Sequence, residues 1–157
     1  MGERARILVV DDDESIRAVL KTILEEHKYS ADLAENGKKG IEKSHAGFYN
    51  LALIDIRLPD MEGTKVLSNL KETVPRMRKI IITGYPTMQN AVEALNQGAD
   101  AYIMKPFDMD KVLQTIQEQL KKQEEEKKYS QEKVTEFIET RVKELEEEKP
   151  ITRQKQA

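Results

Sequence analysis

Short apolar runs alternate with longer amphipathic stretches along residues 5–120. The runs are four to six residues long and rich in β-branched side chains, which is typical of strands buried on both faces of a sheet. The predicted strands are Ala5–Val10, Tyr29–Ala34, Leu51–Ile54, Lys79–Thr83 and Ala101–Met104. In the stretches that follow them, apolar residues recur at helical spacing, least regularly after Asn36-Gly37. The pattern therefore predicts five strand–helix units.

Strict alternation of strands and helices predicts an α/β fold, a parallel sheet with helices on both faces, because parallel strands need crossover connections. We expect Asp13, directly before the first amphipathic stretch, to be a helix N-cap. The stripe of Met88, Ala91, Val92 and Leu95 is predicted to belong to the core. His27 and His45 lie at predicted helix ends and are expected at the surface.

Charge is unevenly distributed and divides the chain. From Gln117 on, 21 of the 41 residues are charged, against 34 of the 116 before it. A segment so charged cannot bury a core of its own. Together with the helical spacing up to Leu120, this predicts a globular domain over 1–122, a charged helical extension over 123–149 and a disordered tail over 150–157.

Composition excludes several classes of protein. The net charge of −3 gives no electrostatic footprint for nucleic acid or an acidic membrane. No apolar run approaches the roughly 20 residues that span a bilayer, and no secretory signal precedes the acidic run that ends at Asp13. Without cysteine, the chain has no disulfide, thiol nucleophile or cysteine-bound zinc. We expect a soluble cytoplasmic protein.

Polar residues follow four of the five predicted strands. Asp11 and Asp12 follow the first strand, Asp55 the third, and Lys105 the fifth, while Thr83 ends the fourth. The carboxyl ends of the strands form the usual functional edge of such a sheet, so these side chains are expected to converge.

Converging carboxylates repel one another and usually hold a hard cation such as Mg²⁺. A carboxylate beside that cation can itself act as the nucleophile towards a phosphoryl group, which gives an aspartyl phosphate. A lysine ammonium and a threonine hydroxyl would then bind the phosphoryl oxygens.

At this point the chain resembles a known family, the response-regulator receiver domains of two-component signalling (CheY-like). The matching segments are ILVVDDDESIR at 7–17, LALIDIRLPDMEG at 51–63, IIITGYPT at 80–87 and DAYIMKPF at 100–107. The resemblance implies a doubly wound, flavodoxin-like sheet of five parallel strands in the order 2-1-3-4-5. It covers about residues 5–122, and no output domain is identifiable after it.

The resemblance also implies roles for the acidic residues. Asp55 would be the phosphoacceptor and Asp12 the principal Mg²⁺ carboxylate, with Mn²⁺ as the alternative ion. Asp11 would hold a metal-bound water or the ion more loosely. The third ligand from the protein would be the backbone carbonyl of Arg57, not its side chain.

Further roles are implied for residues after the fourth and fifth strands. Thr83 and Lys105 would bind the phosphoryl group, with Gly84 leaving room for it, and the Lys105-Pro106 peptide would be cis. Tyr102 stands at the position of the aromatic switch that turns inward when Thr83 moves towards the phosphate; a packed aromatic residue is the alternative.

Arg57 and Tyr85 each lie two residues beyond a site residue, at positions that flank the acyl phosphate in the family. Both are large, so we expect them to obstruct the attacking water and to slow self-dephosphorylation.

The extension has helix-forming composition and an apolar stripe through Val134, Ile138, Val142 and Leu145, with Phe137 beside it. Lys127 interrupts the heptad spacing between this stripe and Leu120. Two interpretations stay open: a solvated helix, or a short coiled coil or partner-docking helix. A hydrophobic staple around Ser130 would instead begin a second helix.

The leading functional hypothesis is a phosphorylation-dependent switch rather than an enzyme with an external substrate. Its expected partners are a sensor histidine kinase, an unknown output protein, and a second copy that binds through the face of helix 4, strand 5 and helix 5 or through the C-terminal helix. The alternatives are an unphosphorylated scaffold and a phosphatase with an aspartyl nucleophile. Such a phosphatase needs an acid two residues after the nucleophile, where Arg57 stands.

Overall fold

The computed structural model describes residues 4–84 and 86–156, with side chains described to residue 147. Five parallel strands form one sheet in the order β2-β1-β3-β4-β5, which confirms the predicted topology. The strands are β1 (Arg6–Val10), β2 (Ser30–Ala34), β3 (Leu51–Asp55), β4 (Arg78–Thr83) and β5 (Ala101–Met104).

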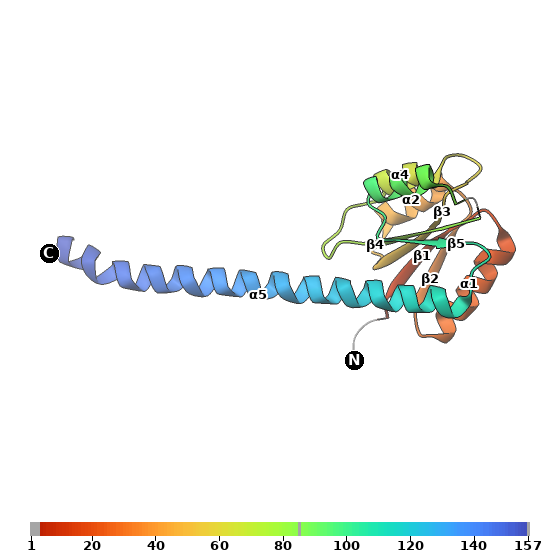
Figure 1. The fold of residues 1–157 in the computed structure, drawn as a ribbon. Coiled ribbons are helices and arrows are strands. Elements are labelled where there is room, and N and C mark those ends of the chain that lie inside the picture. The colour runs from red at the N-terminus through yellow and green to blue at the C-terminus, as the bar shows by residue number, and fades with distance from the viewer. Residues whose placement is uncertain (1–3, 85, 157) are drawn as a thin grey trace. The chain divides into compact units, whose positions relative to one another are not determined.

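Helices cover both faces of the sheet (Figure 1). The five helices are α1 (Glu14–Glu26), α2 (Gly37–Ala46), α3 (Gly63–Asn69), α4 (Met88–Asn96) and α5 (Met109–Gln156). Side chains of α1 and of the first turns of α5 pack on one face of the sheet, and side chains of α2, α3 and α4 pack on the other.

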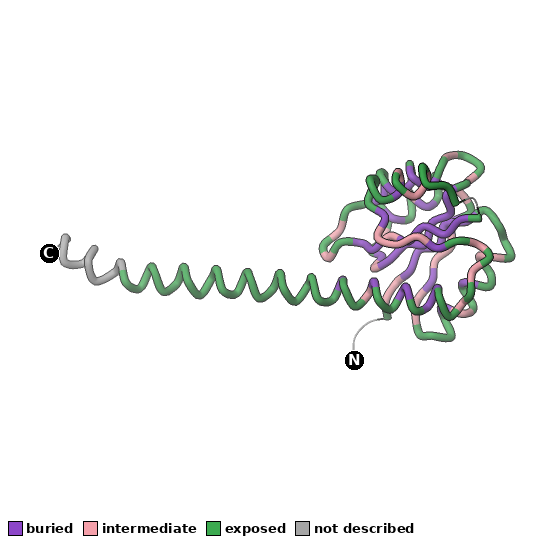
Figure 2. The backbone as a smooth tube through the Cα atoms, in the orientation of Figure 1, coloured by how far each residue is buried: buried purple, intermediate pink, exposed green. Residues whose placement is uncertain are grey.

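Alternation along the strands builds two separate cores. In β1, Leu8 and Val10 pack under α2 and α3, while Ile7 and Val9 pack under α1 and α5. Successive side chains of a strand point to opposite faces, so a continuous apolar run serves both cores. All five residues of β3 are buried for this reason (Figure 2).

Side-chain caps fix where three of the helices begin. Asp13 accepts hydrogen bonds from the backbone N–H groups of Ser15 (2.9 Å) and Ile16 (3.1 Å), which confirms it as the N-cap of α1. Asn36 and Thr87 cap α2 and α4 in the same way. His27 and His45 are exposed, as expected.

The predicted core stripe of α4 is wrong. Met88 is 81% exposed and Leu95 59% exposed, and Val92 is also exposed, whereas Ala94 is fully buried. Helical spacing identifies an apolar face but not the direction in which that face points. In α4 the small Ala94 lies towards the sheet, and the large apolar side chains lie towards solvent.

The last helix belongs to two units of the chain, Met1–Gln123 and Glu124–Ala157. Gln123 is buried, and its Nε2 donates to the backbone carbonyls of Asn50 (2.8 Å) and Arg76 (2.7 Å). These bonds attach α5 to the two loops that precede β3 and β4. They lie at the amino-terminal edge of the sheet, opposite the edge where the acidic residues were predicted.

Beyond Gln123, every residue from 124 to 147 is exposed (Figure 2). The helix is continuous through Ser130, so the alternative of a second helix beginning there is wrong. The disorder expected over 150–157 concerns residues whose side chains lie outside the described part of the chain, and it stays a prediction. Among the described residues, no helix combines the length and the apolar character needed to cross a membrane.

Candidate functional site

The carboxyl edge of the sheet gathers the predicted polar residues. Asp11 and Asp12 follow β1, Asp55 ends β3, Thr83 ends β4, and Lys105 follows β5. One carboxylate oxygen from each of the three aspartates lies within 4.8 Å of the others. We call these three residues the acid cluster. Asp11 and Asp55 are buried, at 3% and 7% exposure, and Asp12 is exposed.

Lys105 bridges the two buried acids. Its Nζ donates to Asp11 Oδ2 and to Asp55 Oδ2, each at 3.0 Å. All three side chains are largely withdrawn from solvent. Two buried carboxylates would be strongly unfavourable without a counter-charge, so the shared ammonium is what makes their approach tolerable.

The pKa values of Asp55 and Lys105 are shifted by burial and by the neighbouring charges. Burial raises the pKa of Asp55 and the charge of Asp11 acts in the same direction, against the lowering effect of the Lys105 hydrogen bond. Burial alone would lower the pKa of Lys105, but its bonds to Asp11 and Asp55 outweigh burial and raise it. The lysine is therefore held as a cation, while ionised Asp55 remains partly uncompensated.

Backbone and side-chain bonds fix Asp11 in place. Its backbone N–H donates to the carbonyl of Ala34 (3.1 Å), and its Oδ1 accepts from the N–H of Asp13 (2.9 Å). Arg17, one turn into α1, donates from Nη1 to the Asp11 carbonyl at 2.7 Å. Arg17 has no role in the sequence prediction, because an arginine on the polar side of an amphipathic stretch carries no signal of this contact.

Asp55 is held by the loop that follows it. The N–H of Arg57 donates to Asp55 Oδ1 (3.2 Å), and the N–H of Gly63 donates to the carbonyl of Ile56 (2.7 Å). A Cβ at Gly63 would lie 2.3 Å from the backbone oxygen of Asp55. The return of the chain against β3 therefore requires a residue without a side chain at this position. The block that ends in Gly63 was recognised in the sequence, but the packing role of the glycine was not.

Thr83 is fully buried, and its carbonyl accepts from the N–H of Lys105 at 2.7 Å. A Cβ at Gly84 would be in ordinary van der Waals contact with the Lys105 side chain, at 3.8 Å from its Cβ. The Lys105-Pro106 peptide is cis, as the resemblance implied. Tyr85 lies outside the described residues.

Tyr102 is partly buried and packs against the core under α2, α3 and α4. Burial raises the pKa of its hydroxyl. The hydroxyl oxygen is enclosed, and it has no hydrogen-bond partner within 4–84 and 86–147. A buried hydroxyl without a hydrogen bond destabilises the fold. If the ring turned outward, the hydroxyl would bind water instead.

The acid cluster fits a small hard cation. Its donors are carboxylate oxygens, which Mg²⁺ prefers, and ligand oxygens on one Mg²⁺ ion lie about 3 to 4 Å apart. The separations within 4.8 Å approach that geometry without rearrangement of the strands. A cation here would supply the charge neutralisation that Lys105 alone does not provide for three carboxylates.

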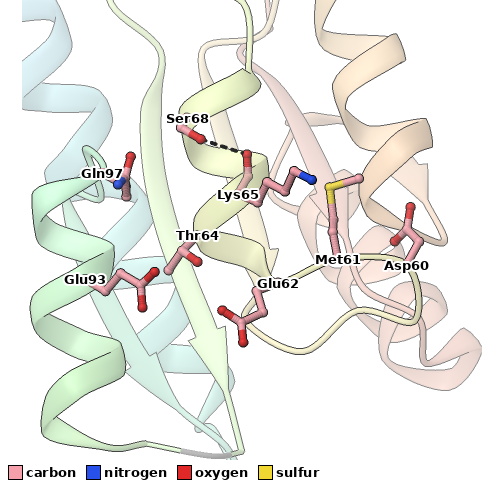
Figure 3. Close-up of a pocket in the computed structure, with 8 residues that line it drawn as sticks. All are labelled: Asp60, Met61, Glu62, Thr64, Lys65, Ser68, Glu93 and Gln97. Carbon is pink, nitrogen blue, oxygen red and sulfur yellow. Dashed lines mark hydrogen bonds between the residues drawn. The ribbon is translucent and has the colours of Figure 1, made fainter.

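A cavity of about 480 Å³ lies elsewhere, between α3, α4 and the loop before α3 (Figure 3). Glu93 of α4 lies opposite Thr64 of α3, and Gln97 follows the end of α4. The full lining is Asp60, Met61, Glu62, Thr64, Lys65, Ser68, Glu93 and Gln97. This lining includes neither the three residues of the acid cluster nor Thr83 or Lys105, so the cavity is separate from the acid cluster.

Comparison with known proteins gives the same assignment as the site. The model of the response regulator receiver domain matches residues 7–117. The chain belongs to this family. Receiver domains are signalling domains of two-component systems, and they interact with histidine kinases and output domains. The predicted CheY-like class is thereby confirmed.

Three similar proteins show how far the likeness to known receivers extends. The transcriptional regulatory protein ZraR of Klebsiella oxytoca is 40% identical over 119 residues, which are 76% of this chain and 27% of that protein. The CheY-like receiver domain protein of Methanospirillum hungatei JF-1 is 47% identical with a TM-score of 0.76, covering 78% of this chain and 98% of that one. TrrA of Thermotoga maritima, solved in complex with Mg²⁺-BeF, is 33% identical with a TM-score of 0.66, covering 73% and 98%.

The chain spans about half or less of the length of the curated relatives it matches. The receiver domain alone accounts for the similarity, and the extension after residue 123 lies outside the matched family model.

Proposed function

We propose that Asp55 accepts a phosphoryl group from the phosphohistidine of a sensor histidine kinase and that the phosphorylated receiver acts as a switch. The observation that carries this proposal is the buried Asp55 carboxylate, which shares the Lys105 ammonium with a second acid inside the acid cluster. In the transfer, the P–N bond to the imidazole breaks, a P–O bond to Asp55 forms, and the imidazole nitrogen takes up a proton.

Positioning and charge account for most of the catalysis in phosphoryl transfer, which suits a site of so few residues. Mg²⁺, held by Asp11, Asp12, Asp55 and the backbone carbonyl of Arg57, would neutralise charge on the phosphoryl oxygens. Lys105 lies 3.0 Å from Asp55 Oδ2, so its ammonium can bind one of those oxygens without leaving the site. Thr83 ends the neighbouring strand β4 and would bind another.

The switch would run from Thr83 to Tyr102 and then to the surface. Tyr102 lies on β5, whose strand pairing to β4 sets Thr83 against Met104. The enclosed, unpartnered hydroxyl of Tyr102 supports a second ring position, in which the hydroxyl would reach water. A shift of Thr83 towards a phosphoryl group would change the space beside that ring.

The exposed apolar residues of α4 and β5 support an output face. Met88, Val92 and Leu95 of α4 and Met104 of β5 are all exposed. Large apolar side chains grouped on neighbouring elements are typical of a protein-binding surface. The face would bind an output protein or a second copy of this chain, and the C-terminal helix offers a second contact.

Phosphorylation with acetyl phosphate and Mg²⁺ tests the proposal without knowledge of the kinase. We expect wild type to gain one phosphoryl group by intact mass, and Asp55→Asn to gain none. Asp13→Asn is the matched control, since asparagine also caps a helix and Asp13 lies outside the acid cluster. We expect it to be phosphorylated as wild type is.

Absence of incorporation in wild type would support the unphosphorylated scaffold and overturn the proposal. Steady release of phosphate from many equivalents of an added phosphomonoester, dependent on Asp55, would support the phosphatase instead. Wild-type incorporation in Asp55→Asn would show that another residue is the acceptor.

A further inference from the structure

The segment 124–147 of α5 is helical and exposed along its whole length. All of its residues are exposed, including the large apolar residues Val134, Phe137, Ile138, Val142 and Leu145. In proteins, most of the stability of a helix comes from burying an apolar face against another element. The exposed apolar stripe therefore stabilises the helix only when another protein surface buries it.

We propose that this stripe is covered by the same segment of a second copy, in a parallel, in-register two-stranded coiled coil. The proposal goes beyond the phosphorylation of Asp55 and does not require it. Its seam consists of Ile138, Val142 and Leu145, which are four and three residues apart, the spacing of successive d, a and d positions. Among parallel coiled coils, a β-branched residue at a followed by leucine at d, here Val142 and Leu145, favours two strands.

The charges beside the seam select a partner identical to this chain. With Val142 at a, Lys127 and Arg141 take g positions, and Glu132 and Glu146 take e positions. In a parallel pair, each g residue faces the e residue five positions later on the other helix. Lys127 then faces Glu132 of the second copy, and Arg141 faces Glu146.

An antiparallel pair would instead bring like charges together. In that arrangement e positions face e positions, so Glu132, Glu139 and Glu146 would meet glutamates of the second copy. Within one helix, Arg141 Nη1 bonds Glu144 Oε2 at 3.1 Å, with both side chains about half exposed. Such a surface pair contributes little, so it does not oppose the contact across the seam.

The seam is short, because the positions before it are polar. Lys128, Gln131 and Thr135 take the preceding a, d and a positions. Polar a and d residues weaken a coiled coil and fix its register. The apolar contacts of the seam are therefore confined to the last turns of the described segment, and the dimer is concentration-dependent.

Adjacent residues test the register. Phe137, beside the stripe, is 72% exposed and takes a c position outside the seam, while Ile138 takes d. A frame that continued the spacing of Leu120 through Lys127 and Val134 would instead put Phe137 and Arg141 in the seam. In sedimentation equilibrium of the full chain, we expect Ile138→Glu to weaken dimerisation about tenfold or more, and Phe137→Glu to leave it within about twofold.

Orientation has its own test, because the chain contains no cysteine. Leu145→Cys introduces one thiol per chain at a d position. We expect rapid interchain disulfide formation under mild oxidation, which requires the two copies to be parallel and in register. Phe137→Cys is the matched control and is expected to cross-link slowly. Arg141→Glu should weaken the dimer, and Arg141→Glu with Glu146→Arg should restore it.

A monomer at all concentrations would overturn the proposal, as would a dimer that Phe137→Glu disrupts and Ile138→Glu does not. Loss of the dimer in Val92→Glu with no effect of Ile138→Glu would assign pairing to the α4 face and also overturn it. Performed on Asp55→Asn, the same series should give the same result. Failure of the phosphorylation proposal would therefore leave this inference standing.

Discussion

Gly63→Ala perturbs the site without removing any functional group. The added Cβ would lie 2.3 Å from the Asp55 backbone oxygen, 2.9 Å from the Ile56 Cα and 3.0 Å from the Asp55 carbonyl carbon. All three atoms are backbone, so no flexible side chain can move aside. Either β3 shifts at Asp55 or the start of α3 moves away from it.

The expected loss of stability follows from those distances. Overpacking by one methyl group in a fixed environment costs about 1–3 kcal/mol. Since every clash here is with backbone, we expect the upper part of this range, about 2–3 kcal/mol in the free energy of unfolding. Alanine gains up to about 1 kcal/mol over glycine in a helix interior, but Gly63 is the first residue of α3, where the gain is smaller.

Urea unfolding followed by far-ultraviolet circular dichroism measures this cost. Gly47→Ala is the matched control, because Gly47 has extended backbone and a Cβ there would approach nothing closer than 3.6 Å. We expect the control to stay within about 0.5 kcal/mol of wild type. Mg²⁺ titration by calorimetry should also show weaker binding in Gly63→Ala. Equal stability of the two variants would refute the reasoning.

Four other outcomes are expected. In metal-free protein, Asp55→Asn should be more stable than wild type at neutral pH. The raised pKa of Asp55 means that folding opposes ionisation of its carboxyl group. In urea unfolding, the stability difference between the two proteins should vanish as the pH falls below the ordinary carboxyl pKa. Burial and the hydrogen bond to a nearby aspartate raise the pKa of Tyr49 to about 12. The stabilisation of the fold by its neutral hydroxyl is therefore complete below about pH 10 and lost as the pH rises towards 12. Tyr49→Phe should remove this dependence of stability on pH, and ultraviolet titration of wild type should show the late ionisation. Arg57→Asn combined with Tyr85→Glu should accelerate loss of phosphate from the phosphorylated protein, followed by intact mass, and an unchanged rate would contradict an obstructing role. Gln123→Ala should cost about 1–3 kcal/mol in urea unfolding by leaving two backbone carbonyls without their amide donor, whereas exposed Gln131→Ala should cost almost nothing.

The sheet could be predicted from sequence because a strand buried on both faces consists of a continuous run of apolar residues. β3 is buried over its whole length, and its apolar run ends where Asp55 begins. The site followed from the fold, since parallel strands bring residues at their carboxyl ends to one edge. That rule placed Asp11, Asp55 and Lys105 together although they are separated by up to 94 positions along the chain.

The orientation of α4 could not be predicted, because its stripe of Met88, Val92 and Leu95 has the spacing of a core face. Periodicity distinguishes the two faces of a helix. Which face is buried depends on how closely each can pack against the sheet. Ala94 lies on the other side, where a small side chain permits close approach to the sheet.

Gly63 and Arg17 act through the backbone of the neighbouring acids, and such contacts leave no periodic signal. A glycine in a loop is usually explained by turn geometry, whereas Gly63 is required by the closeness of the Asp55 oxygen. Arg17 donates to the Asp11 carbonyl, six positions earlier in the chain. Both contacts become visible only once the loop and the helix are placed in three dimensions.

The burial of α4 through Ala94 has a consequence for where the molecule opens first. The nine-residue helix has one fully buried residue, and that residue contributes a single methyl group to the core. By contrast, Leu20 and Leu24 anchor α1, and Val112 and Ile116 anchor α5. Local opening free energy scales with the apolar area that an element withdraws from water. Amide protons of α4 should therefore exchange with solvent through a small, independent fluctuation, while those of α1 and the first turns of α5 wait for global unfolding.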